Sequence, residues 1–232
     1  MGFTLTVNGT DSILNTNIFP PISLKEEYEC GLIGLQTYNS IPNVDKDNQR
    51  FFIDYYEFEI PVGSYEIDDI SSFIKAKLAT ISKDIEFDLK ANNNTLQCEI
   101  ISNKTIYFDK PNSVGRLLGF SSVQLPPNRI HTSDLPVEII KVNTIRVDCS
   151  IIEGSYLNNK KTHTLHEFSP TVAPGYKINE VPRNVIYLPV TSQEIRSITI
   201  KLLDQNNRLI NFRGENISVR LHLQPKYDSL QR

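Results

Sequence analysis

The 232-residue sequence has no tryptophan and only four alanines. It has no apolar run close to the roughly 18–20 residues that a membrane-spanning helix requires. It also has no excess of positive charge, because 24 Lys and Arg stand against 27 Asp and Glu. The basic residues are scattered and do not alternate with aromatic ones, whereas nucleic-acid binding needs clustered cations or stacking platforms. The sequence therefore predicts neither a membrane span nor specific nucleic-acid binding.

Cysteine is scarce, and Cys30, Cys98 and Cys149 are far apart in the chain. Their odd number and the absence of any Cys-x-x-Cys or Cys/His spacing argue against a disulfide framework and a zinc knuckle. Cys149 falls on the apolar phase of an alternating stretch, which predicts a buried free thiol. The first residues, MGFTLTVNGT, lack the basic and apolar regions of a secretory signal, which predicts a protein made inside the cell and kept reduced.

The sequence motifs of enzymes are missing as well. There is no nucleophile elbow, no glycine-rich phosphate loop and no zinc-protease helix motif. The stretch HTLHE brings His163, His166 and Glu167 together, but residues three apart on a strand point to opposite faces. We therefore predict no catalytic residue, no cofactor and no metal site, and the protein is not expected to be an enzyme.

Isoleucine dominates the apolar residues, with 28 Ile against the four Ala, and 13 Pro and 10 Gly supply turns. Isoleucine favours strands and alanine favours helices, so the composition predicts a mainly β protein. Three stretches alternate apolar and polar residues, as strands with one buried face do. Their apolar members are Ile145, Val147, Cys149, Ile151; Ile198, Ile200, Leu202; Ile217, Val219, Leu221, Leu223.

The other expected elements lie before these strands. A short strand at 3–7 precedes an Asn- and Pro-rich stretch to about Pro21, and Gly31 and Gly34 mark a bulge or close packing within an extended segment at 26–37. The stretch 51–60 predicts one aromatic strand covered on both faces. Apolar residues at helical spacing predict an α-helix at about 66–81.

A hairpin is expected after this helix, with strands at 84–90 and 95–101 around an Asn-rich turn. The Pro-rich stretch 125–136 is the best internal boundary. Long-range strand pairing without a repeat favours a single jelly-roll β-sandwich with one inserted helix and a following hairpin.

Several uncommon stretches resemble the minor capsid (penton) proteins of Polinton/Maverick elements and adintoviruses. The resemblance covers about residues 50–223, and its most specific blocks are THTLHEFSPTVAPGYKI and NVIYLPV; the others include FEIPVGSYEIDDISSFI, PNSVGRLLGF and VNTIRVDCSIIEGSYLNN.

The resemblance implies one penton-type domain over 1–232, with 61–120 as a helix–hairpin elaboration. It also implies a homopentamer at the vertices of an icosahedral double-stranded DNA virus or virus-like element, beside a double jelly-roll major capsid protein. The expected location is therefore the virion.

A ring of identical subunits needs two different side surfaces, and buried aromatic residues are common anchors in such contacts. The candidates for the subunit interface are Phe51, Phe52, Tyr55 and Tyr56 in the aromatic stretch, and Phe168 and Tyr176 in the Pro- and Tyr-rich loop 168–176. Packing inside one copy is the competing role for each of these residues.

Two other functions stay open. The chain could be a non-viral ligand- or carbohydrate-binding β-sandwich module, although the lack of tryptophan disfavours sugar stacking. It could also be a cupin-type enzyme, which would need several histidines around one metal where only HTLHE clusters them. A pentamer would support the vertex protein, and a stable monomer the binding module.

Overall fold

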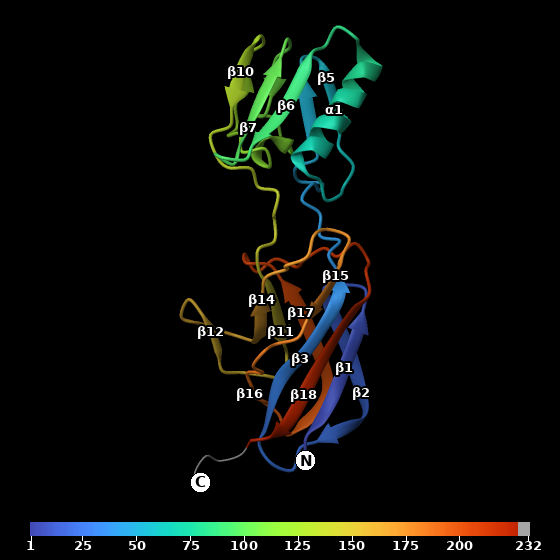
Figure 1. Ribbon diagram of the computed structural model, residues 1–232. Coiled ribbons are helices and arrows are strands. Elements are labelled where there is room, and N and C mark those ends of the chain that lie inside the picture. The colour runs from blue at the N-terminus through green and yellow to red at the C-terminus, as the bar shows by residue number, and fades with distance from the viewer. Residues whose placement is uncertain (227–232) are drawn as a thin grey trace. The chain divides into compact units, whose positions relative to one another are not determined.

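The chain divides into two compact units in a computed structural model that describes residues 1–226 (Figure 1). Unit 1 contains Met1–Ile41 and the chain from Val142 onward, and unit 2 contains Pro42–Lys141. Unit 2 is thus inserted in the sequence of unit 1. The boundary lies beyond the expected Pro-rich stretch, because residues 129–132 form a strand within unit 2. Residues 227–232 of the expected domain lie outside the described residues.

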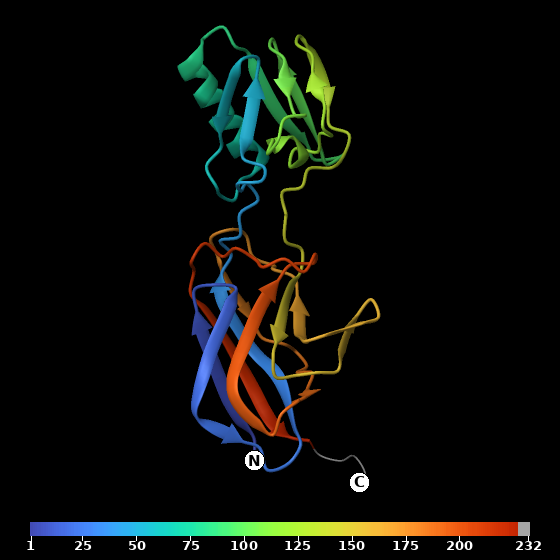
Figure 2. The same cartoon turned by 180° about the vertical axis from the view of Figure 1, so that it is seen from behind.

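Unit 1 is a sandwich of two antiparallel sheets, one with four main strands and the short β16 and the other with four strands (Figure 2). One sheet has the order β1-β18-β3-β15 and the other β14-β11-β17-β2. If these strands are numbered one to eight along the chain, the orders are 1-8-3-6 and 5-4-7-2, the interleaving of a jelly roll. Their bounds are β1 Phe3–Gly9, β2 Ile13–Ser23, β3 Tyr28–Tyr38, β11 Ile145–Cys149, β14 Thr164–Phe168, β15 Lys177–Glu180, β17 Glu194–Leu203 and β18 Ile217–Pro225.

Three short strands complete unit 1. β16 (Leu188–Pro189) pairs with β3, and β12 (Ser155–Leu157) and β13 (Lys160–Thr162) pair only with each other. Unit 2 follows the third strand of the roll and precedes the fourth, so the jelly-roll fold predicted from the sequence is confirmed and the helix and hairpin are placed between β3 and β11.

The alternating stretches supply the core of the sandwich. All their apolar residues are buried, and on β18 Ile217, Val219, Leu221 and Leu223 are at most 1% exposed. β18 lies between β1 and β3, and β11 lies between β14 and β17, so both are interior strands. The inward register predicted for residues 145–151 is confirmed.

Glycine in β3 allows both features expected there. The register with β18 shifts between Gly34 and Leu32, which leaves Ile33 as a bulged residue. A Cβ atom on Gly31 would lie 2.4 Å from Cγ1 of Val185, so Gly31 permits the segment after β15 to pass close to the sheet.

Unit 2 consists of one helix and two small sheets, β5-β4-β8-β9 and β10-β7-β6. The helix and hairpin expected from the sequence are confirmed. The bounds are β4 Arg50–Ile53, β5 Tyr56–Glu59, α1 Ile67–Ile81, β6 Phe87–Asn92, β7 Gln97–Ser102, β8 Ile106–Tyr107, the 3₁₀ turn Val114–Arg116, β9 Gln124–Leu125 and β10 Arg129–Thr132.

Helix α1 begins where the backbone N–H of Glu66 donates to the Asp69 carboxylate at 3.1 Å, half of a capping box. The apolar residues Ile67, Ile70, Ile74 and Leu78 on one face of this helix are buried in the core of unit 2. No helix in the described part of the chain is long and apolar enough to cross a membrane.

The expected single strand at 51–60 is wrong. The chain reverses at Asp54 and Tyr55, so this stretch is the hairpin β4–β5, in which Ile53 pairs with Tyr56. Asp54 has a φ of +47°, a conformation that Asp tolerates better than most residues, and its N–H donates to the Thr105 carbonyl at 2.8 Å. An alternating aromatic pattern concealed this turn.

Candidate functional site

The predicted interface residues of the aromatic stretch fall into two groups. Phe51 is fully buried, and its ring centroid lies 5.3 Å from Phe58 and 5.5 Å from Phe87. Phe52 is also buried, with Nζ of Lys110 4.8 Å from its ring centroid. Within one copy these two side chains therefore have almost no surface left for a partner.

The two tyrosines of the same stretch face solvent. Tyr55 is 98% exposed at the tip of the β4–β5 hairpin, and Tyr56 is 41% exposed. The turn that the sequence pattern concealed is thus the feature that exposes an aromatic side chain.

The other candidate residues flank the loop 168–176 of unit 1. Phe168 packs partly buried against the sandwich core, whereas Tyr176 is 68% exposed. Asn39 holds this loop in place, since its side-chain amide donates to the Val172 carbonyl at 2.7 Å and its backbone N–H donates to the Tyr176 carbonyl at 2.8 Å. The loop therefore presents Tyr176 from a fixed position.

The two histidines of HTLHE have separate partners. A ring nitrogen of His163 lies 2.6 Å from the Ile152 carbonyl, and Nε2 of His166 lies 2.9 Å from the Glu180 carboxylate. The second contact joins β14 to β15 and hence one sheet to the other. Among residues 1–226 no group of three His, Cys, Asp or Glu side chains could hold a metal ion, and the absence of metal stays a prediction.

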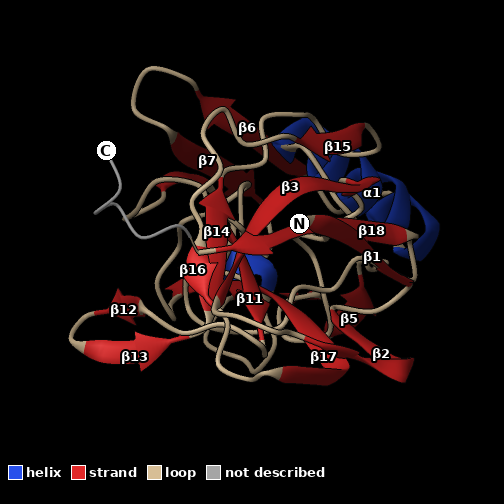
Figure 3. Ribbon diagram, turned by 90° about the horizontal axis from the view of Figure 1, so that it is seen from below, coloured by secondary structure: helices blue, strands red, loops and turns tan. Residues whose placement is uncertain are grey.

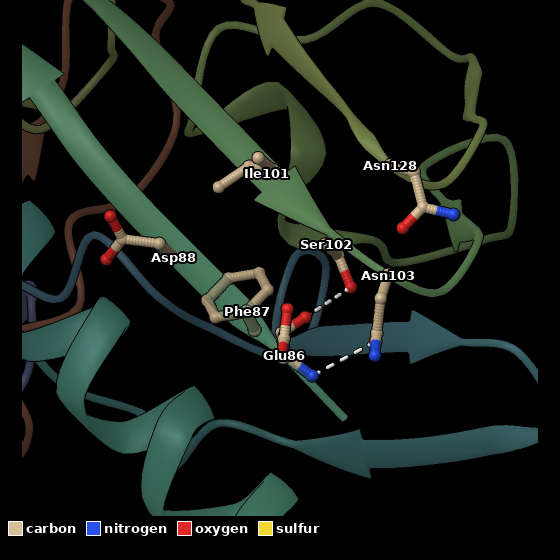
Figure 4. Close-up of a pocket in the computed structure, with 7 residues that line it drawn as sticks. All are labelled: Glu86, Phe87, Asp88, Ile101, Ser102, Asn103 and Asn128. Carbon is tan, nitrogen blue, oxygen red and sulfur yellow. Dashed lines mark hydrogen bonds between the residues drawn. The ribbon is translucent and has the colours of Figure 1, made fainter. Parts of the chain in front are cut away.

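A shallow depression of about 350 Å³ lies over strands β6 and β7 of unit 2 (Figure 4). Several of its polar groups are engaged by the chain itself. The Ser102 hydroxyl donates to the Glu86 carbonyl at 2.7 Å, and the Glu86 N–H donates to the Asn103 side chain at 3.0 Å. Phe87 packs on Phe51, so its ring belongs to the core and gives no open platform for a sugar.

The charge of Asp88 in this depression is balanced by two lysines. Hydrogen bonds from Lys75, at 2.6 Å, and from Lys90, at 2.8 Å, lower the pKa of the Asp88 carboxyl below its ordinary value. A carboxylate with a lowered pKa is a weak general base, because general catalysis is most effective with a pKa near the working pH. The arrangement therefore favours a structural role for Asp88.

The three thiols are all buried, which confirms the prediction for Cys149. Cys30 on β3 and Cys149 on β11 come from opposite sheets, and their side chains interact in the core. The interaction with Cys149 and burial raise the pKa of Cys30. Burial alone raises the pKa of Cys98, in unit 2, to about 12. Sequence spacing gave no sign that Cys30 and Cys149 are neighbours.

We expect none of the three thiols to react with an aromatic disulfide reagent in the native protein at pH 8, and all three to react after unfolding. The thiolate is the reactive form, and burial suppresses both its formation and its access. The Cys98 pKa is raised on folding from 9.0, so its contribution to the free energy of unfolding is lost as pH rises from about 9 towards 12. Rapid labelling of one native thiol, located by mass spectrometry, would contradict this burial.

Two exposed features of unit 1 had no signal in the sequence. One is Phe19 on β2, which is 96% exposed, and the other is the β12–β13 hairpin, which carries the 65% exposed Tyr156. An isolated apolar residue in a Pro-rich stretch predicts nothing by itself, and only strand register shows where Phe19 lies.

Comparison with solved structures gives a match over almost the whole chain. The crystal structure of the SeMet-labelled mavirus penton protein has a TM-score of 0.51 and 10% sequence identity, and the match covers 96% of this chain and 98% of that chain. No protein-family model matches the sequence, and no curated protein sequence matches it. The chain therefore shares the fold of a viral penton protein, across both of its units.

Proposed function

We propose that this protein is a minor capsid protein that forms the vertex of an icosahedral capsid. The observation that carries the proposal is the 96% coverage by the mavirus penton fold, which includes the inserted unit as well as the jelly roll. The sequence resemblance to the penton proteins of Polinton/Maverick elements and adintoviruses supports the same role. In this proposal the whole chain acts as one penton-type domain with 61–120 as its elaboration.

A vertex protein works through surfaces and needs no catalytic group. Five copies around one axis must contact each other through two different surfaces so that the ring closes. We infer that the partners are four further copies and, at the rim, a double jelly-roll major capsid protein in the virion. A net charge of −3 per chain causes only weak repulsion between copies.

The candidate subunit interface consists of the aromatic side chains that are exposed in one copy. Tyr55, Tyr56 and Tyr176 are exposed, and tyrosine suits an interface because it combines a large apolar area with a hydroxyl. Phe168 supports the loop that ends in Tyr176. Phe51 and Phe52 act from within the core by holding the hairpin that presents Tyr55.

Light scattering after size-exclusion chromatography tests the assembly. We expect a species of five times the chain mass, and we expect electron-microscopy class averages to show closed rings with five-fold symmetry. Closure is expected because heterologous contacts otherwise continue as an open filament. A protein that stays monomeric at high concentration would contradict the vertex function and would favour the ligand-binding module.

A further inference from the structure

Strand β2 carries a bulge with an exposed aromatic residue. Asn17 pairs with Ser197 and Ile22 pairs with Ile195, so residues 18–21 of β2 face the single residue Arg196 of β17. The extra residues lift Phe19 out of the sheet, where it is 96% exposed beside the exposed Pro20. Bulges commonly redirect a side chain at a sheet edge, and a fully exposed phenylalanine has no stabilising contact in the single copy.

The second feature is the β12–β13 hairpin, residues 155–162. Asn158 and Asn159 form its turn with φ angles of 46° and 63°, as the two-residue turns of tight hairpins require. Its two strands pair only with each other, and the Ser155 hydroxyl donates to the Thr162 carbonyl at its base at 2.8 Å. A two-stranded hairpin is at best marginally stable alone in water, so this one is expected to gain stability from a surface that covers it.

These two features lie at opposite edges of one sheet. The order β14-β11-β17-β2 places the Phe19 bulge on the last strand, and the hairpin leads directly into β14, the first strand. Figure 1 and Figure 3 both show β12 and β13 apart from the sheets and on the side away from β2. Each copy of the chain thus has the β12–β13 hairpin, called the arm below, at one edge of the sheet, and the exposed Phe19, called the knob, at the other edge.

The chemistry of the two surfaces is compatible. The hairpin exposes Tyr156 opposite Lys161, next to Lys160, and contains no carboxylate. Residues 2–24, which include β1 and β2, contain no Lys or Arg, and their one charged side chain is Asp11. The β2 edge therefore offers an aromatic anchor to which β1 and β2 add no cation. Arg196 of β17, opposite the bulge, is paired with the Glu194 carboxylate at 2.8 Å, so its charge is balanced where the hairpin lysines would approach.

We propose that the β12–β13 hairpin of one copy packs against the β2 bulge of the next copy, so that Tyr156 and Phe19 are buried together between them. This inference rests on the proposed ring assembly and adds one specific contact to the tyrosine surfaces named for it above. The contact is heterologous, because an arm meets a knob, and repetition of such a contact gives a ring or a filament. The bulge also keeps two β2 edges from pairing with each other as flat strands.

Two variants test the contact separately. In one, Phe19→Asp places a charge at the knob; in the other, two glycines replace residues 155–162. We expect each variant to keep the circular-dichroism spectrum and melting temperature of the parent but to associate at least about 30-fold more weakly, the loss typical of an anchor residue. The control Leu96→Asp alters a side chain that is 59% exposed in unit 2 and should leave assembly unchanged.

Mixing the two variants gives the sharper result. The Phe19→Asp chain keeps its hairpin and the hairpin-less chain keeps its Phe19, so one intact contact can form between them and no ring can close. Native mass spectrometry should show a one-to-one heterodimer. The contact is wrong if the parent assembles and both variants assemble as well as the parent does. It is also wrong if the parent assembles, both variants are monomers and their mixture gives no heterodimer. In either case the proposed vertex function stands. A monomeric parent overturns both.

Discussion

Replacing Val147 by aspartate is expected to abolish soluble, folded protein. Val147 is fully buried on β11, between β14 and β17. The new carboxylate would have no solvent and no partner, which costs about 4 kcal/mol or more, against a total stability of about 5–15 kcal/mol. Soluble yield and thermal unfolding by circular dichroism measure the effect, and we expect any soluble fraction to melt at least about 10 °C lower.

Arg220→Asp is the matched control. Arg220 is exposed and alternates with the buried Val219 and Leu221 on β18, so the same carboxylate there should leave folding intact. If Val147→Asp is soluble with an unchanged melting temperature, the inward register of β11 is incorrect.

The second large effect is expected in unit 2, where Gly119→Ala should loosen the segment from 117 to 138. Gly119 has a φ of +81°, and a Cβ atom would lie 2.1 Å from the carbonyl oxygen of Leu135. The Leu135 N–H donates to the Gly119 carbonyl at 2.9 Å, so the two backbones cannot separate without losing this bond. The left-handed backbone strain and the overpacking together should lower the free energy of unfolding by about 3 kcal/mol. Hydrogen exchange of peptides within 117–138 measures the loss of protection.

Gly175→Ala isolates the conformational part of this cost. Gly175 has a similar φ of +84°, but a Cβ atom there would meet nothing within 4 Å. We expect Gly175→Ala to lower the free energy of unfolding by about 1 kcal/mol, which is the cost of the left-handed backbone alone. Equal effects of the two substitutions would show that the approach of Leu135 to Gly119 is not close.

The sequence predicted those parts of the fold in which a local pattern reflects burial. α1 runs over Ile67–Ile81, against the expected 66–81, because its apolar stripe has an unbroken helical period. β11, β17 and β18 were predicted for the corresponding reason, since each has one buried and one polar face. In these elements the local preference and the tertiary environment agree.

The elements missed depend on partners distant in the sequence. β2 forms in an Asn- and Pro-rich stretch because β17 pairs with it across about 180 residues, and propensity gives little sign of that. The β4–β5 hairpin was missed because a left-handed Asp54 can interrupt an aromatic run without glycine or proline.

Prediction of the candidate surfaces failed for a similar reason. An aromatic side chain looks the same in the sequence whether it fills a core, as Phe51 does, or projects from a turn, as Tyr55 does. Phe19 was missed because its exposure follows from a register shift between two strands, which no single segment encodes.

The place of β18 in its sheet has a consequence for synthesis of the chain. β18 spans residues 217–225 and lies between β1 and β3, which are made almost two hundred residues earlier. Unit 2 is complete once residue 141 has left the ribosome and is free to fold first, since domains generally fold as units during translation. Until β18 is synthesised, the edges of β1 and β3 that will pair with it are unpaired. Unpaired strand edges are prone to aggregation, so the incomplete sandwich is expected to depend on chaperones during this interval.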